Sequence, residues 1–212
     1  MKGAHSNCQR DRLDLFENYY NRASSEMDDK KIKKFMALAG QETQLSITMG
    51  TLEKRKLGAQ LLLSETLEYV IKGLGITPIV NGQPITDPNA LVYEAGDREP
   101  EGLEMIDGLA DVAYTMYWNE CAFGIPLEEA FEAVCDNNLE KFVKLVDWNG
   151  PVRSLEQSEW HCNKNISWPD SVVEVTVISF CNEFYAVGKD ISGKVRKPSS
   201  YCSVDLTPLL GK

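Results

Sequence analysis

The chain has 212 residues, 43% of them hydrophobic, so it is long and apolar enough to bury a core and a disordered chain is not expected. Its net charge of −10 and pI near 4.8 argue against non-specific binding to nucleic acid or an anionic membrane, because phosphate-binding surfaces are normally basic. No apolar run is long enough for a membrane span, and the N-terminus lacks the apolar middle of a signal peptide, so we expect a cytoplasmic protein.

Helical patterns dominate the first two thirds of the chain. Two amphipathic helices are predicted over residues 10–26 and 29–40, the second closed by Gly40. The main helix is expected from about Leu52 to Leu74, where Gly75 ends it.

A second long helix is predicted after a loop rich in Pro, Asn, Gly and Asp. Asp97 is its expected N-cap, and Gly124 follows its last residue, Phe123. Pro126 then opens a last helix over residues 127–146, with a break expected near the two asparagines at 137 and 138.

Residues 171–180 alternate valines with polar residues, which is typical of a half-buried strand, and a turn at Asn182 and Glu183 predicts a hairpin with the run that follows. An isolated hairpin is only marginally stable, so it should pack on the helices or on a partner. We therefore predict an all-α, antiparallel helical bundle with a small β-hairpin appendage near the C-terminus. The expected divisions are a helical catalytic domain (1–147), a β-containing insertion (148–190) and a basic C-terminal tail that packs on the core (191–212).

Carboxylates interrupt both long helices at spacings of one turn. On a helical wheel two sets share a sector, and these are Glu65, Glu68 and Lys72 in the first helix and Glu104, Asp107 and Asp111 in the second. The remaining faces are mostly apolar, so the acids are expected to point into the protein or a cleft. Clustered buried carboxylates are costly unless a cation joins them, and their oxygens suit Mg²⁺ or Mn²⁺.

An ordinary surface stripe is the alternative for these acids. The ExxE spacing occurs four times, and pairing with Lys72, Lys54 or Arg55 on a solvated helix face gives the same pattern. A di-iron centre is excluded because it needs Glu-x-x-His pairs, and neither His5 nor His161 has one. A zinc site at His161 and Cys162 fits no standard ligand spacing.

Three ordered motifs resemble the MazG-like, all-α nucleoside triphosphate pyrophosphohydrolases, in particular the branch related to phosphoribosyl-ATP pyrophosphatase. The run "RKLGAQLLLSETLEYVIKGLG" is similar to that family's first metal helix, and "DGLADVAYTMYWNECAFGIPLEEAFEAVCDNNLEKF" is similar to its second. The tail "GKVRKPSSYCSVDLTPLL" resembles the ending of some members. The likeness covers about residues 50–147 and 190–210.

The resemblance implies roles for individual residues. The implied metal ligands are Glu65, Glu68, Asp107 and Asp111, with Glu104 as a secondary candidate. The substrate candidates are Asn138 and Lys141 for the phosphates or nucleotide, Lys194, Arg196 and Lys197 for the triphosphate, and also Lys72 and Trp118. Ser64 and Gly108 depart from the family, which often has acids at these positions, and Trp118 stands where close relatives have glycine. Trp118 can stack on a base or fill a core.

The activity implied is Mg²⁺-dependent hydrolysis of an NTP or dNTP between its α and β phosphorus atoms, with Glu65 or Glu68 accepting the proton of water. A Gly-rich GKS/T loop is absent, which argues against a P-loop ATPase. The resemblance implies a homodimer or homotetramer with shared sites. The acidic charge and the lack of a long apolar run predict no nucleic-acid or membrane partner. The alternative is a non-catalytic helical module for nucleotide binding or protein interaction, as the missing acids at 64 and 108 indicate.

Overall fold

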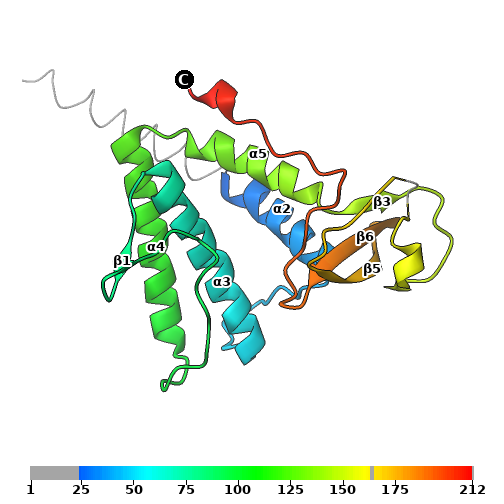
Figure 1. Cartoon of the computed structure of the whole chain (residues 1–212), viewed down its shortest axis with the longest axis horizontal. Helices are drawn as coiled ribbons and strands as arrows, with labels where there is room; N and C mark the ends of the chain where they lie inside the picture. The colour runs from blue at the N-terminus through cyan, green and yellow to red at the C-terminus, as the bar shows by residue number, and fades with distance from the viewer. Residues whose placement is uncertain (1–23, 163–164, 212) are drawn as a thin grey trace, which may run out of the picture. The chain divides into compact units, whose positions relative to one another are not determined.

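The computed structural model describes residues 24–162 and 165–211 (Figure 1). They divide into two compact units. The sheet unit contains the described residues up to Thr43, Trp118–Ile191, and those from Val195 onward; the helical unit contains Gln44–Tyr117 and Ser192–Lys194. The predicted helix over 10–26 lies almost entirely outside the described residues.

A four-stranded antiparallel sheet organises the sheet unit. Its order is β3-β6-β5-β4, with β3 at Val143–Leu145, β6 at Glu183–Asp190, β5 at Val172–Phe180 and β4 at Arg153–Ser154. The predicted hairpin is confirmed as β5 and β6, although its turn is formed by Cys181 and Asn182, whose φ angles of 51° and 63° suit a tight two-residue loop.

The all-α prediction is wrong. The described residues contain four α-helices and two antiparallel sheets, so the fold is mixed α and β. The hairpin is not an appendage, because β3 and β4 extend it on both edges and both of its faces are covered.

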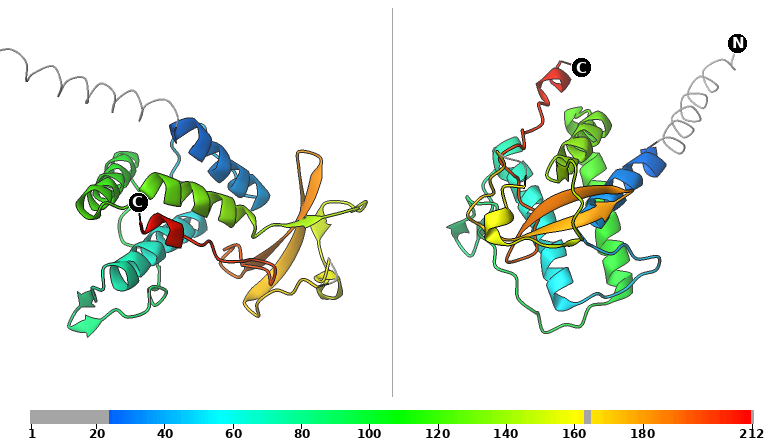
Figure 2. Two further views of the ribbon diagram at one scale, coloured as in Figure 1. Left: turned by 90° about the horizontal axis from the view of Figure 1, so that it is seen from above. Right: turned by 90° about the vertical axis from the view of Figure 1, so that its right-hand side faces the viewer.

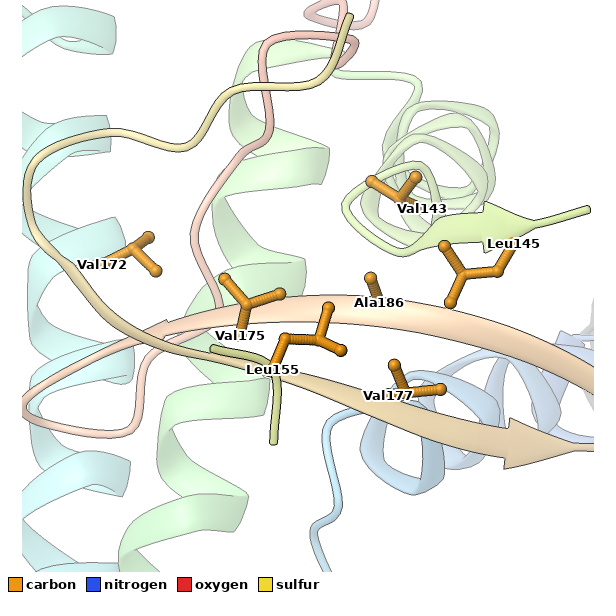
Figure 3. Close-up of a cluster of buried hydrophobic side chains, with 7 residues drawn as sticks. All are labelled: Val143, Leu145, Leu155, Val172, Val175, Val177 and Ala186. Atoms are coloured by element: carbon orange, nitrogen blue, oxygen red, sulfur yellow. The ribbon is translucent and has the colours of Figure 1, made fainter. Parts of the chain in front are cut away.

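One face of the sheet buries a cluster of aliphatic side chains (Figure 3). Val175 and Val177 are fully buried and lie beside Ala186 of β6 and Leu155. Tryptophans from the segment between β3 and β5 pack against this cluster, and these are Trp148, Trp160 and Trp168. The irregular segment therefore serves as the cover of this face.

The opposite face packs on α2 (Ser24–Leu38) and on Leu139, the last residue of α5 (Leu127–Leu139). The two helices lie side by side (Figure 2). Leu38 is buried there with Tyr185 and Val187 of β6. The rings of Phe35 and Phe142 meet edge to face at 5.0 Å, a favoured aromatic geometry. Alternate residues of β5 and β6 thus pack into two different cores.

The last helix is shorter than predicted. α5 stops at Leu139, and residues 143–145 form β3 instead of continuing to 146. Val143 and Leu145 are buried while Lys144 is exposed. This alternation has the two-residue period of a strand, and it outweighs the helical spacing of the same residues. The break expected near Asn137 and Asn138 is confirmed.

The helical unit contains α3 (Leu52–Glu68), which continues as a π-helical turn, η1 (Tyr69–Gly73), and most of α4 (Gly102–Phe123). The predicted ends are confirmed, because Gly75 and Gly124 have φ angles of +66° and +64°, a conformation that glycine adopts without strain. The predicted start of α4 is wrong, since it begins five residues after Asp97. The loop between them holds a short hairpin, β1 (Ile79–Val80) and β2 (Gln83–Pro84), around an Asn-Gly turn.

The helical unit has no hydrophobic core of its own. Within 44–117, all of which the structure describes, no hydrophobic side chain other than that of Pro88 is buried. Leu63 of α3 is 41% exposed and Leu109 of α4 is 63% exposed. Helices without a wide polar face are expected to be buried on most sides, and these are not.

Replacing Val177 by Ala should lower the free energy of unfolding of the sheet unit by about 1–3 kcal/mol, because the side chain is fully buried between packed neighbours. Val173→Ala on the same strand is the matched control, since that side chain is 56% exposed and should change stability by less than about 0.5 kcal/mol. Urea denaturation followed by tryptophan fluorescence measures both, and equal losses would contradict the two-faced sheet.

Candidate functional site

Glu65 and Glu68 of α3 are both exposed and lie one turn apart. Glu68 accepts a hydrogen bond from the ammonium group of Lys72 at 2.7 Å, and this bond raises the pKa of Lys72 above its ordinary value. The structure thus gives Lys72 the intrahelical partner that a surface stripe would have. Exposed pairs of this kind contribute little stability, so a metal ion or a phosphate could compete for either partner.

Glu68 stands where α3 changes from α-helical to π-helical geometry. The amide of Leu74 donates to the carbonyl of Tyr69 at 2.9 Å, five residues back, instead of four. Single π-helical turns are rare and occur often at functional sites. The turn lies directly C-terminal to the Glu65 and Glu68 pair and contains Lys72.

Ser64, at a position where the resembled family commonly has an acid, is the buried residue of α3. It is 4% exposed, and its hydroxyl donates to the carbonyl of Leu61 at 3.4 Å. A carboxylate there would lose its hydration, which costs several kcal/mol in a buried site. The small hydroxyl therefore suits the position.

The acids of α4 are exposed along the helix. Glu104, Asp107 and Asp111 make no hydrogen bond or ion pair with any other described residue. Nothing lies within 4 Å of the place that a side chain at Gly108 would occupy. An acid at 108 would therefore fit here, unlike one at 64.

The carboxylates form two separate pairs. In the part of the chain that the structure describes, no three Asp, Glu, His or Cys side chains come together as a metal-binding group. Oxygen donors in pairs suit Mg²⁺, which one or two carboxylates often hold together with water and substrate phosphates. The donor chemistry therefore fits magnesium, whereas a four-carboxylate cage within one chain is not formed.

Two of the predicted substrate residues lie at the end of α5 in the sheet unit. Asn138 is half-buried, and the ammonium group of Lys141 lies 5.8 Å from the ring centroid of Phe35. Trp118 is 57% exposed and meets Phe123 of the same helix edge to face, with ring centroids 6.4 Å apart. Trp118 therefore fills no core among the described residues.

The basic tail residues have different settings. Arg196 forms an ion pair with Asp190, whose side chain is 6% exposed, so it has a structural role. Lys197 is exposed, with its ammonium group 4.7 Å from the ring centroid of Tyr201. Lys194 is half-buried and is grouped with the helical unit.

Asn137, which was not predicted as a site residue, anchors the C-terminal segment. Its side-chain amide donates to the carbonyl of Cys202 at 2.7 Å, and the Tyr201 hydroxyl donates to its side-chain oxygen. Burial raises the pKa of Tyr201. An asparagine pair at a helix end was the only sequence signal, and it did not distinguish buried Asn137 from Asn138.

The histidine and cysteines of the sheet unit form no metal site. The ring nitrogen Nδ1 of His161 lies 2.9 Å from the carbonyl oxygen of Ile166. No disulfide joins the five cysteines of the described chain, which are Cys121, Cys135, Cys162, Cys181 and Cys202. Within the ranges 24–162 and 165–211, no group of metal-binding side chains includes any of them.

Within the described ranges, no helix has the length and hydropathy needed to cross a bilayer.

No family model, curated protein or solved structure matches the chain. The likeness to the MazG-like enzymes therefore rests on the residues and their order along this chain.

Removing the Tyr201 hydroxyl should loosen the C-terminal segment. Tyr201→Phe leaves the buried oxygen of Asn137 without its donor, which costs about 1–3 kcal/mol. Hydrogen exchange at residues 199–206 should speed up, whereas Tyr114→Phe, at a side chain 70% exposed, should leave it unchanged. Unchanged exchange in Tyr201→Phe would show that this contact does not hold the segment.

Proposed function

We propose that the chain is a Mg²⁺-dependent nucleotide pyrophosphohydrolase of the cytoplasm, which cleaves an NTP or dNTP between the α and β phosphates. The observation that carries the proposal is the pairing of acids at one-turn spacing on each of two long helices of the same unit. Exposed pairs of hard oxygen donors are what a metal–phosphate complex requires. The order of the surrounding sequence motifs, which resembles that of the MazG-like enzymes, supports the same activity.

The ligands proposed for magnesium are Glu65 and Glu68 of α3 with Asp107 and Asp111 of α4, and Glu104 lies one turn before Asp107. When bound, magnesium would neutralise the phosphates and acidify a bound water. The chain's own residues orient the substrate and accept a proton. A carboxylate of α3, Glu65 or Glu68, is the proposed base, and Glu68 forms an ion pair with Lys72. Asn138 and Lys141, which the resemblance implies as phosphate contacts, belong to the sheet unit.

We propose further that the active form is a homodimer or homotetramer. Besides the exposed leucines, the helical unit has an apolar hollow of about 500 Å³, lined by Ile47, Met105, Ile106, Leu109 and Ala110. Extended apolar surfaces of this kind are typical of interfaces. A second copy would bury them, and it would bring further carboxylates to a site that one chain leaves as pairs.

A non-catalytic binding module is the second candidate. Two observations favour it, namely the ion pair between Glu68 and Lys72 and the missing group of three metal-binding side chains among the described residues. Under this alternative the exposed helices bind a partner, and no triphosphate is cleaved.

Glu68→Gln and Asp111→Asn should each lower Mg²⁺-dependent pyrophosphate release by about 100-fold or more, because each removes a charged metal ligand. Glu129→Gln is the matched control, since it alters another exposed ExxE pair, on α5, and should keep full activity. The assay uses a panel of NTPs and dNTPs with and without EDTA. Absence of cleavage in the wild type would favour the binding module, and equal activity in all three variants would refute the proposed metal ligands.

Leu109→Asp should dissociate the oligomer and reduce activity, because it places a charge in the apolar hollow of α4. The control is Ile191→Asp, at a side chain that is 90% exposed outside the helical unit. Light scattering on a sizing column gives the mass of each protein. A fully active wild-type monomer would refute the shared-site proposal.

A further inference from the structure

A second hollow of the helical unit lies away from the carboxylate pairs. It has a volume of about 440 Å³ and is enclosed by the first two turns of α3 and by the loop before α4. From α3 it is lined by Leu52, Arg55, Lys56 and Ala59, and from the loop by residues 92–96 and 98–100. The spacing of the α3 residues places them on one face of the helix. The volume is within the usual range for small-molecule sites.

This hollow, which we call the α3 pocket, is basic although the chain is strongly acidic. Arg55, Lys56 and Arg98 bring three positive charges against two negative ones from Glu94 and Glu99. The cations of α3 are half-buried, whereas both acids are exposed. Arg55 and Lys56 are therefore less hydrated than the two acids, and partial burial strengthens their attraction for an anion. Arg98 is exposed.

Arg55 is held in place for such a role. Its Nη1 atom donates to the carbonyls of Gly50 at 2.9 Å and Met49 at 3.2 Å, the two residues before the N-cap of α3. A guanidinium group that is already fixed loses little freedom when its remaining N–H groups bind an anion. Lys56 and Arg98 form no ion pair within 4 Å with another described residue.

The remaining lining indicates more than a bare ion. Tyr93 is half-buried in the wall of the α3 pocket, beside the apolar Leu52, Ala59 and Pro100. An aromatic ring next to aliphatic side chains suits an uncharged, planar or apolar group. The lining therefore combines an anion-binding end with a less polar wall.

We propose that the α3 pocket binds an organic phosphate, with Arg55, Lys56 and Arg98 contacting the phosphate and Tyr93 contacting the organic group. Arginine favours phosphate because its planar N–H groups bind two oxygens at once. No residue of the carboxylate pairs lines this pocket, so the binding does not depend on magnesium or on hydrolysis. This phosphate binding goes beyond the proposed enzymatic activity, and it is expected even if the chain hydrolyses no triphosphate.

Titration calorimetry on the full chain in EDTA tests the site, with pyrophosphate, AMP, adenosine and succinate as probes. Pyrophosphate and AMP should bind, whereas adenosine and succinate should bind at least about tenfold more weakly. Lys56→Gln and Arg98→Gln should each weaken AMP binding about tenfold or more, since each removes a charge-assisted contact. Lys54→Gln is the matched control, because Lys54 is an exposed cation of the same helix outside the lining, and it should change affinity by less than about twofold.

Three results would overturn the proposal. No binding of either phosphate would refute the site, and equal weakening by Lys54→Gln would show diffuse charge attraction instead. Succinate binding as tight as AMP would refute the preference for phosphate. Glu68→Gln should keep the binding in EDTA, so loss of hydrolysis and loss of this site are separate outcomes.

Discussion

The burial of apolar surface is the constraint on which the rest of the structure depends, and the two units meet it differently. The sheet unit places alternate residues of β5 and β6 into two cores, one under the tryptophan-bearing segment and one under α2 and α5. The helical unit, within residues 44–117, leaves many of its leucines and isoleucines exposed and buries none of them. Hydrophobic side chains in such number are not stable in water without a partner surface, which is the physical basis for the proposed second copy.

The two sets of candidate functional residues also differ in how far a packed core supports them. Asn138 and Lys141 stand at the end of α5, next to the buried amide of Asn137 that holds the C-terminal segment, so a packed core supports them. The carboxylate pairs stand on helices that lack such support. A site that needs precise positions on α3 and α4 must therefore gain rigidity from assembly, from a bound ligand or from both.

Glycine positions and the valine alternation could be predicted from the sequence because their physical causes are local. Gly40, Gly75 and Gly124 end helices in a conformation that other residues adopt with strain. The strand at 143–145 was missed because Val143 and Leu145 also fit a helical pattern, and only pairing with β6 decides between the two. The Asn-Gly turn at 81–82 was a local signal that should have predicted the hairpin β1–β2.

For the site, one-turn spacing correctly placed each pair of acids on one helix, but it could not show that these helices are exposed, because burial depends on tertiary packing. The α3 pocket had no sequence signal, since Arg55 and Lys56 are almost forty residues from Tyr93 and Arg98 in the chain and the loop brings them together.

Backbone hydrogen exchange of α3 and α4, measured as a function of protein concentration, tests the central claim most directly. The account predicts that protection in these helices rises with concentration, while β5 and β6 are strongly protected throughout. Strong protection of α3 and α4 in a dilute monomer would contradict it, because the helices would then be stable without a second copy.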